Sequence, residues 1–262
     1  MKFGFIGTGN MASAIIRGAR RDDVFQKEEI FGYDCDVEKA QALQADCGIK
    51  VCQTMDALIE ACDYLVLAVK PQTLDTLLPA LREKCKDKRF ITIAAGKTLS
   101  YYETMLGAVA VVRVMPNINA RVGAATSCFC ANAYADAKDI EAVCKLFSTV
   151  GTILELPEAQ FSAFTAIAGS SPAFSYMYID ALAKAGVRAG LPRATALAAA
   201  AGSVLGSAKL VLQGDTHPCD LADQVCSPGG TTIDGVYMLH RGAFEGLVEE
   251  AVAAVIEKEK KL

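Results

Sequence analysis

The sequence has few of the residues on which several common functions depend. Its only histidines are His217 and His240, and the pair Cys128 and Cys130 lacks zinc-finger spacing, so we predict no metal site. It lacks the G-x-S-x-G motif of serine hydrolases. Basic (26) and acidic (30) side chains nearly balance, giving a net charge of −4. Since a nucleic-acid backbone needs a basic surface, we expect no nucleic-acid partner.

The sequence also lacks features of secreted and membrane proteins. Residues 1–6 lead directly into a strand pattern, which leaves no room for a signal peptide, so we predict a cytoplasmic protein with ten reduced cysteines. The stretch 161–179 has no charge and approaches the length of a membrane span. Gly169-Ser170-Ser171-Pro172 interrupts it, however, and we expect packed helices and no membrane partner.

What the sequence does contain is enough apolar material for a large core. Hydrophobic residues make up 52% and charged residues 21% of 262 residues, a composition typical of folded proteins. At roughly 150 residues per domain, this length predicts one large or two unequal domains.

The order of strand-like and helix-like sequence patterns along the chain predicts the fold class. Apolar runs typical of buried strands occupy 2–6, 29–34, 64–69, 90–95, 110–115, 123–131 and 152–155. Helical patterns lie between them at 11–19, 37–45, 56–61, 74–85, 99–106 and 137–150. This alternation favours an α/β domain, Rossmann-like, with a parallel sheet covered by helices on both faces. We place this dinucleotide-binding domain at residues 1–158.

From Gln160 onward only helical patterns remain, including alanine-rich stretches at 174–186 and 193–213. We therefore predict a second, all-α domain at residues 159–262. A helical domain with so many small apolar residues often hides them against a twin subunit, which predicts a homo-oligomer. The alternative is a monomer whose helices pack on the sheet domain.

A dinucleotide fingerprint of the form G-x-G-x-x-A stands between the first strand and the first helix. It consists of Gly7, Thr8, Gly9, Asn10, Met11 and Ala12. Gly7 permits a tight turn, Gly9 lets the backbone approach a pyrophosphate, and Ala12 lets the helix pack closely on the sheet. A glycine-rich turn that binds nothing is the alternative, but the strand-turn-helix context favours dinucleotide binding.

Asp34 ends the second predicted strand, where an acid can accept hydrogen bonds from the adenine ribose. Because a carboxylate repels a 2′-phosphate, Asp34 leans the prediction toward NADH over NADPH, and Asp36 adds negative charge. Alternatively, Asp34 only starts the turn before the next helix.

Ligand-facing loops should emerge where later strands end. The residues at these positions are Ala68, Val69, Lys70, Pro71, Ala95, Gly96 and Asn117. Lys70 could bind a phosphate, a ribose or a substrate carboxylate, or it could simply be solvated. Asn117 supplies an amide near the same edge.

The helical region contains a second glycine turn. Its residues are Ser227, Gly229, Gly230, Thr231 and Thr232. Free backbone N–H groups at such a turn can bind a small carboxylate. Thr231 and Thr232 can either cap the following helix or donate hydrogen bonds to that ligand, and the sequence allows both roles.

Taken together, four motifs make the chain resemble the pyrroline-5-carboxylate reductases over essentially its whole length. They are residues 5–12, 68–71, 169–174 and 223–232, and the last resembles the signature of that family. The resemblance implies a Rossmann-like domain and a helical dimerisation domain, a homodimer or a larger ring of dimers, and an active site completed by the partner subunit.

The resemblance also implies hydride transfer from NADPH or NADH to the C=N carbon of pyrroline-5-carboxylate, a small-molecule substrate, giving proline. It assigns the pyrophosphate to 7–12, the nicotinamide half to 68–71 and 95–96, and the substrate carboxylate to the amides at 230–232. Thr232 would lie near the ring nitrogen as the catalytic residue, orienting the substrate or a water. Two alternatives remain: a related dehydrogenase or imine reductase for another small carboxylate, and a non-catalytic cofactor sensor.

Overall fold

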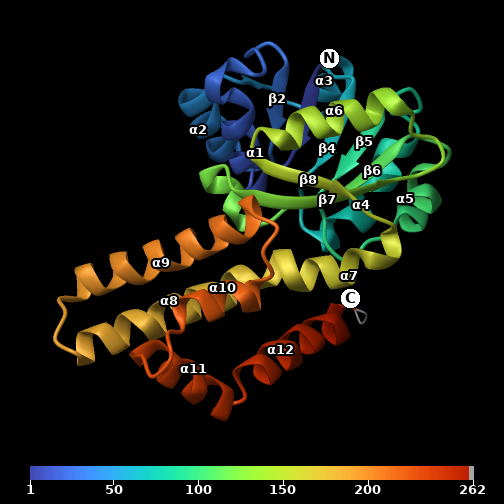
Figure 1. The fold of residues 1–262 in the computed structure, drawn as a ribbon. Coiled ribbons are helices and arrows are strands. Elements are labelled where there is room, and N and C mark those ends of the chain that lie inside the picture. Colours follow the sequence, from blue (N-terminus) through green and yellow to red (C-terminus); the bar gives the residue numbers. More distant parts are fainter. Residues whose placement is uncertain (260–262) are drawn as a thin grey trace. The chain divides into compact units, whose positions relative to one another are not determined.

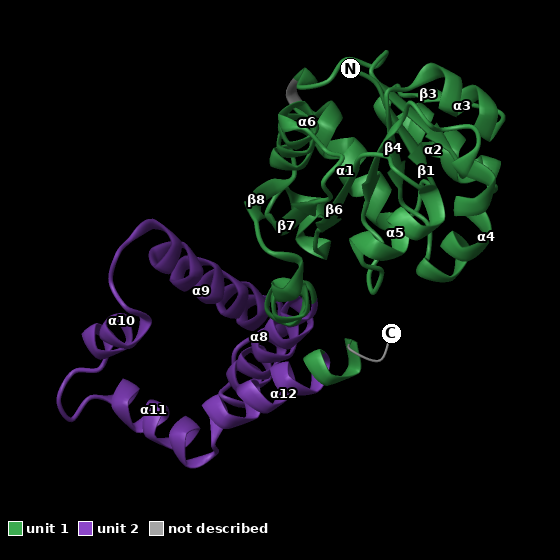
Figure 2. Cartoon of the chain, turned by 90° about the vertical axis from the view of Figure 1, so that its right-hand side faces the viewer, with its two compact units in different colours: residues 1–169, 256–262 green, residues 170–255 purple. Residues whose placement is uncertain are grey.

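The computed structural model describes residues 1–259, except for the side chain of Asp22, and the chain separates into two compact units (Figure 2). Unit 1 comprises residues 1–169 together with the end of the last helix from residue 256, and unit 2 comprises residues 170–255. Each unit is described by itself below.

Unit 1 is built on an eight-stranded sheet in the order β3-β2-β1-β4-β5-β6-β7-β8 (Figure 1). The strands are β1 (Phe3–Ile6), β2 (Ile30–Tyr33), β3 (Lys50–Val51), β4 (Tyr64–Leu67), β5 (Arg89–Thr92), β6 (Val111–Met115), β7 (Ala125–Ala131) and β8 (Gly151–Glu155). The order 3-2-1-4-5-6 is that of dinucleotide-binding sheets, in which ligands bind where the order reverses, between β1 and β4. The predicted Rossmann-like fold is therefore confirmed.

Helices pack on both faces of this sheet. They are α1 (Asn10–Arg20), α2 (Val37–Cys47), α3 (Met55–Ala61), α4 (Pro71–Arg82), α5 (Leu99–Leu106) and α6 (Ala137–Ser148). Thr54 and Thr98 cap α3 and α5 by accepting hydrogen bonds from backbone N–H groups. Asp136 begins α6 in a capping box with Asp139.

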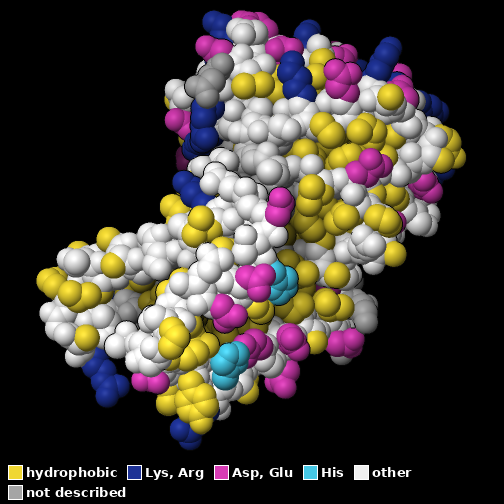
Figure 3. Space-filling model, in the orientation of Figure 1, with side chains coloured by type: hydrophobic (Ala, Val, Ile, Leu, Met, Phe, Trp, Pro, Cys, Tyr) yellow, Lys and Arg dark blue, Asp and Glu magenta, His cyan; other side chains and the backbone are white. Residues whose placement is uncertain are grey.

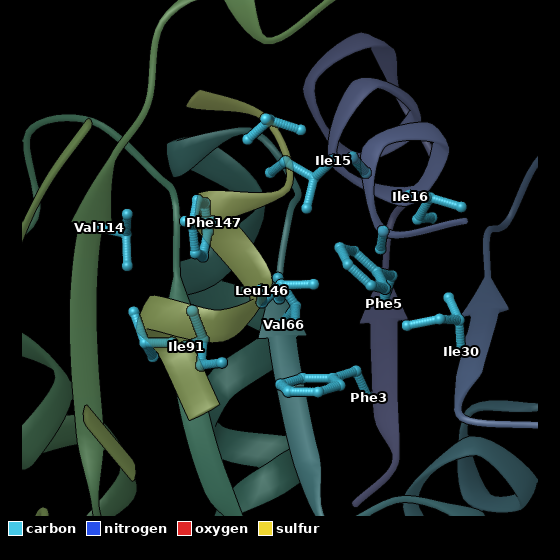
Figure 4. Close-up of a cluster of buried hydrophobic side chains, with 14 of the residues drawn as sticks. Phe3, Phe5, Ile15, Ile16, Ile30, Val66, Ile91, Val114, Leu146 and Phe147 are labelled. Carbon is cyan, nitrogen blue, oxygen red and sulfur yellow. The ribbon is translucent and has the colours of Figure 1, made fainter. Parts of the chain in front are cut away.

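The strands bury both of their faces, so that alternate residues enter separate cores. Phe3 and Phe5 of β1 pack with Ile15 of α1 and Phe147 of α6 (Figure 4). Ile6 of the same strand instead belongs to the core under α3, α4 and α5. This period of two explains why the strands read as continuous apolar runs rather than alternating ones.

One part of the sheet differs from the prediction of a parallel sheet. β6 and β7 pair antiparallel, with Met115 opposite Cys128. The connection between them contains only a 3₁₀ helix, η2 (Ile118–Val122). A parallel pairing needs a crossover of a dozen or more residues, which this connection is too short to provide.

A short irregular segment follows the sheet. It consists of the 3₁₀ helix η3 (Glu158–Gln160), one turn of α7 (Phe161–Phe164) and a π-helical segment η4 (Thr165–Ser170). The charge-free stretch 161–179 is therefore not one uniform helix, because a π-helical segment interrupts it before α8.

Unit 2 is entirely helical in its described residues. Its helices are α8 (Ser171–Arg188), α9 (Arg193–Gln213), α10 (Pro218–Val225), α11 (Thr231–Arg241) and most of α12 (Phe244–Glu259). α8 and α9 pack through the small side chains of Ala183, Ala196 and Ala200, which allow close approach. Many large apolar side chains of this unit are exposed, among them Met177, Leu205 and Leu212 (Figure 3).

One helix of unit 2 is long and apolar enough to cross a membrane. α9 spans 21 residues with a mean hydropathy of 1.5 in its most apolar window, and 11% of that window is buried. A single helix of this kind is weak evidence for a span, because a helix that packs against another protein surface has the same composition.

Candidate dinucleotide and substrate sites

The glycine loop after β1 lies against the end of β4, at the point where the strand order reverses. Gly7 has a φ of +95°, a conformation that favours glycine. A Cβ on Gly7 would come within 2.8 Å of the carbonyl oxygen of Ala68. Ala68 in turn donates its backbone N–H to Ile6 over 2.9 Å. The two predicted motifs, 7–12 and 68–71, are thus in direct contact.

The N-terminus of α1 has the features of an anion site. Gly9 is its N-cap, and within residues 1–259 no side chain caps it by a hydrogen bond. A Cβ built on Gly9 meets no described atom within 4 Å, so that a ligand can approach the backbone. Ala12 is buried and lets the helix lie close to the sheet. This end of the helix therefore fits the pyrophosphate of a dinucleotide.

Asp34 is held against the glycine loop rather than free at the end of β2. Its Oδ2 accepts hydrogen bonds from the backbone N–H of Thr8 at 2.7 Å and from Thr8 Oγ1 at 3.0 Å. Its Oδ1 accepts from the backbone N–H of Asp36 at 3.0 Å and from the Cys35 thiol. Partial burial raises the pKa of Asp34, but these hydrogen bonds outweigh it and hold the pKa below the ordinary value of 3.8.

A cavity of about 360 Å³ lies at this switch point. The predicted residues that line it are Gly7, Gly9, Asp34, Ala68, Val69 and Lys70. Lys70 is also the N-cap of α4, and Pro71 is the first residue of that helix. The cavity therefore joins the ends of β1, β2 and β4, as a dinucleotide site requires.

Several residues of the cavity were not predicted from the sequence. They are Ile6, Tyr33, Cys35, Met55, Thr73 and Leu77. The positions of Ile6, Tyr33 and Cys35 at the ends of β1 and β2 could have identified these three. Met55, Thr73 and Leu77 lie on α3 and α4, where nothing in the local pattern distinguishes them from core residues.

The remaining predicted cofactor residues lie outside that cavity. Asn10 and Met11 line a smaller hollow of about 170 Å³ with Ile118 and Arg121. Gly96, at φ +76°, lines a separate cavity of about 510 Å³, and Ala95 precedes it in the same turn.

The side chain of Asn117 is occupied within unit 1. Its Nδ2 donates to the carbonyl oxygen of Ala168 at 2.8 Å, and its Oδ1 accepts from the backbone N–H of Asn119 at 3.2 Å. Asn117 is also buried. Its amide therefore ties the end of β6 to the π-helical segment, a role that the sequence did not indicate.

The second glycine turn lies in unit 2, at the start of α11. Gly229 has a φ of +69°, and Gly230 donates its N–H to the carbonyl oxygen of Ser227 at 3.0 Å. Gly230, not a threonine, is the N-cap, and in the part of the chain described here no side chain caps it. Thr231 and Thr232 are exposed, so their hydroxyls and the first N–H groups of α11 are accessible to a ligand.

The other chemistry-bearing residues have structural surroundings. Nδ1 of His217 accepts from the backbone N–H of Cys219 at 3.2 Å and so caps α10. All ten cysteines are free thiols, and burial raises the pKa of Cys62, Cys128 and Cys130 to about 12. Across residues 1–259, no group of three or more His, Cys, Asp or Glu side chains could hold a metal ion.

Comparison with known protein families gives two matches, one in the N-terminal and one in the C-terminal region of the chain. Residues 158–262 match a family model described as pyrroline-5-carboxylate reductase dimerisation. Residues 2–96 match a model described as NADP oxidoreductase, coenzyme F420-dependent.

Relatives match over the full length. A pyrroline-5-carboxylate reductase of Methanosarcina acetivorans is 40% identical, with 100% of this chain and 97% of the relative covered. A crystal structure of the Plasmodium falciparum pyrroline carboxylate reductase with NADP bound has a TM-score of 0.90 at 31% identity, covering 100% of this chain and 97% of the other. The Streptococcus pyogenes 1-pyrroline-5-carboxylate reductase also has a TM-score of 0.90, at 35% identity, with 100% and 99% covered.

Proposed function

This chain belongs to the pyrroline-5-carboxylate reductase family, and we propose how its own residues divide the reaction between a cofactor site in unit 1 and a substrate turn in unit 2. The enzyme reduces the C=N bond of 1-pyrroline-5-carboxylate with NAD(P)H and forms L-proline, the last step of proline biosynthesis. The single observation that carries this assignment is the similarity over the full length of both chains.

Residues Gly7–Ala12 hold the pyrophosphate, which the uncapped N-terminus of α1 and the open space at Gly9 support. Ala68–Pro71, Ala95 and Gly96 hold the nicotinamide half, whereas the side chain of Asn117, also predicted as a cofactor residue, is hydrogen-bonded to Ala168 and Asn119. The bound dihydronicotinamide supplies the hydride, so the task of the chain is to fix the geometry of attack and to exclude water.

The substrate carboxylate binds at the second glycine turn, at Ser227, Gly229 and the backbone amides of residues 230–232, of which the Gly230 N–H also donates to the carbonyl oxygen of Ser227. The free N–H groups at the start of α11 support this role. Thr232 lies near the ring nitrogen and orients the imine or a water molecule. Because a neutral hydroxyl is a poor acid, a substrate that arrives protonated at nitrogen needs only this orientation.

Asp34 weakly favours NADH over NADPH as the cofactor. Its carboxylate lines the cavity and is kept ionised by its hydrogen bonds, which disfavours a 2′-phosphate. The nearby cation Lys39 is already paired with Asp36 at 2.8 Å. We expect Asp34→Ser to raise the ratio of NADPH to NADH activity, measured as kcat/KM for each cofactor. An unchanged ratio would remove Asp34 from the choice of cofactor.

We place the boundary between the dinucleotide-binding domain and the dimerisation domain between residues 158 and 159. The match to the dimerisation model, which begins at residue 158, supports this boundary. The chain forms a homodimer, which can assemble further into a ring of dimers, and a partner subunit covers the apolar surface of α9. The partner also completes the active site. We place the enzyme in the cytoplasm.

Oxidation of NADH and NADPH, followed by absorbance with pyrroline-5-carboxylate as substrate and with proline quantified as product, tests the reaction. We expect Thr232→Ala to lower kcat about tenfold, as loss of one hydrogen bond would, while the dissociation constant for NADH stays unchanged. Thr216→Ala, in an exposed loop of the same unit, is the matched control.

An equal loss of turnover and NADH affinity in the Thr232→Ala variant would contradict the assigned role of Thr232. Turnover of a different imine or keto acid, with none of pyrroline-5-carboxylate, would favour a related dehydrogenase. Binding of NADH without any turnover would favour the cofactor sensor.

A further inference from the structure

An arginine is buried in the middle of the sheet, where its neighbours along the strand are valines. Arg113 of β6 has a side chain that is 8% exposed. Its guanidinium lies 4.5 Å from the centre of the Phe161 ring, and its Nη1 donates to Oε1 of Glu158 at 2.8 Å. Burying a charge is costly unless it is paired, so this pair calls for a role beyond filling space.

The same carboxylate oxygen has a second donor. Oε1 of Glu158 also accepts the backbone N–H of Leu99, the first residue of α5, at 2.8 Å. A carboxylate at this position is favourable because the first N–H groups of a helix have no partner within the helix. Arg113 therefore orients the carboxylate that holds the N-terminus of α5.

The turn between β5 and α5 is thus fixed at both ends. At its beginning, Thr92 Oγ1 accepts from the backbone N–H of Ala94 at 3.3 Å and is 2.6 Å from the hydroxyl of Tyr102. At its end, Glu158 holds Leu99. Between these anchors lie Ala95 and Gly96.

A second brace on this turn ends on a more exposed carboxylate, because Asp75 is 58% exposed and Lys97 23%, against 30% for Glu158 and 8% for Arg113. Nζ of Lys97 lies 3.6 Å from Asp75 of α4 and 4.4 Å from the centre of the Tyr101 ring. The hydroxyl of Tyr101 also donates to Asp75 at 2.6 Å. Water and salt screen such surface pairs. The link from buried Arg113 through partly buried Glu158 is better shielded from solvent, so it is the one that can fix the position of the turn.

We propose that Arg113 and Glu158 are positioning residues, which act through the Leu99 amide to hold the Ala95–Gly96 turn where it receives the nicotinamide half of the cofactor. This proposal rests on the proposed function, which assigns Ala95 and Gly96 to that contact. Displacement of a reacting group by about 1 Å can cost as much as a hundredfold in rate, so a small shift of this turn would be measurable.

The test compares two double variants that differ in one hydrogen bond. Arg113→Met/Glu158→Leu removes both charges and the acceptor for Leu99. Arg113→Met/Glu158→Gln also removes both charges but keeps an amide oxygen that can accept from Leu99. Because neither variant leaves a buried charge unpaired, we expect both to fold.

A third variant controls for loss of a partly buried ion pair elsewhere in unit 1. Arg89 begins β5, at the edge of the sheet opposite the turn, and pairs with the buried carboxylate of Asp139. Arg89→Met/Asp139→Asn should lower the melting temperature without altering the cofactor site.

Three measurements are made below the melting temperature of every variant. Hydrogen exchange of peptides covering 94–101 in the free protein reports the turn, NADPH fluorescence gives the dissociation constant, and steady-state kinetics give KM for each substrate. We expect Arg113→Met/Glu158→Leu to speed exchange and to raise the dissociation constant and KM for NADPH about tenfold, the equivalent of one lost hydrogen bond. KM for pyrroline-5-carboxylate should stay unchanged, and Arg113→Met/Glu158→Gln should restore only part of the NADPH affinity, because it keeps the acceptor for Leu99 but not the arginine that orients it.

Faster exchange with unchanged NADPH affinity would overturn the proposal, because Glu158 would then only cap a helix. Equal losses of NADPH affinity in the Arg89→Met/Asp139→Asn control would also overturn it. Failure of the proposed function would appear differently, as an unsubstituted enzyme that binds NADPH but does not oxidise it with the imine.

Discussion

The two units of this chain hide their apolar side chains to very different extents. In unit 1, Phe3, Phe5 and Phe147 are fully buried in one core. In unit 2, the buried hydrophobic cluster consists of alanines, whereas Leu212 of α9 is 84% exposed. The sheet unit completes its own core, and the helical unit presents a surface that is complete only with something packed on it.

The difference follows from how each architecture buries surface. A sheet covered on both faces buries every residue of its central strands. A pair of helices such as α8 and α9 buries only the stripe where the two meet, here lined by alanines. The remaining apolar stripes need another layer, and residues 158–262 match a dimerisation domain.

The largest effect is expected in the core of unit 1. Phe5→Ala should reduce the free energy of unfolding by about 4 kcal/mol, because it removes a fully buried ring and leaves a cavity between the sheet and α1. Urea denaturation followed by circular dichroism measures it. Leu212→Ala in unit 2, measured at a dilution where the protein is monomeric, is the comparison, with an expected change below about 0.5 kcal/mol because this side chain is exposed in the single chain. Similar losses for both variants would abolish the contrast.

The next effect should appear in assembly rather than in folding. Leu205 of α9 is 57% exposed in the single chain. If a partner covers α9, Leu205→Glu buries a charge in each subunit and should raise the dimer dissociation constant roughly a hundredfold, equivalent to about 2.7 kcal/mol. Light scattering across a dilution series measures it. An unchanged dimer would mean that the partner covers a different face of unit 2.

The smallest effect concerns acid sensitivity. The pKa of Asp34 is lowered in the folded state, so its hydrogen bonds stabilise the protein fully at pH values above the ordinary pKa of 3.8. This contribution is lost as the pH falls through the lowered pKa. Asp34→Asn should therefore lower the free energy of unfolding by about 1 kcal/mol at pH 7, a value already reduced because Asp34 is partly exposed. The loss should become small once the pH lies below the lowered pKa of Asp34.

Asp180 in unit 2 is the matched control for that prediction. Lys184 and Arg193 lower its pKa through hydrogen bonds and charge, but the pair lies at the surface. We expect Asp180→Asn to change stability less than Asp34→Asn at pH 7, and to do so only at low salt. Melting temperatures of both variants, measured in a pH series that falls from pH 7 through the lowered pKa of Asp34, make the comparison. A larger effect at Asp180 would contradict the ranking.

Local signals predicted most elements well. The helices at 99–106 and 193–213 have the predicted bounds, since Thr98 and Pro192 mark their starts clearly. β3 was missed because two residues carry no periodicity. The π-helical segment was also missed, because its wider turn depends on contacts such as that between Asn117 and Ala168.

The candidate site likewise contains residues that the sequence predicted and contacts that it did not. Gly7, Gly9 and Asp34 were identified from their spacing, since a dinucleotide fingerprint is a local pattern tied to a strand and a helix. Asp34 itself shows the limit of that reasoning. The spacing predicts an acid near the ribose, but nothing in the spacing indicates that Thr8 holds both a backbone and a side-chain hydrogen bond to it.

The order of the elements, the position of the glycine loop and the change to an all-helical region depend on residues close together in the chain, so sequence patterns predicted them. The antiparallel pairing of β6 and β7, the contact of Asn117 with the π-helical segment, and the hold of Arg113 and Glu158 on the start of α5 appear only in the folded structure. Those features join residues far apart in the sequence. Their free energy comes from burial and pairing, which no local pattern encodes.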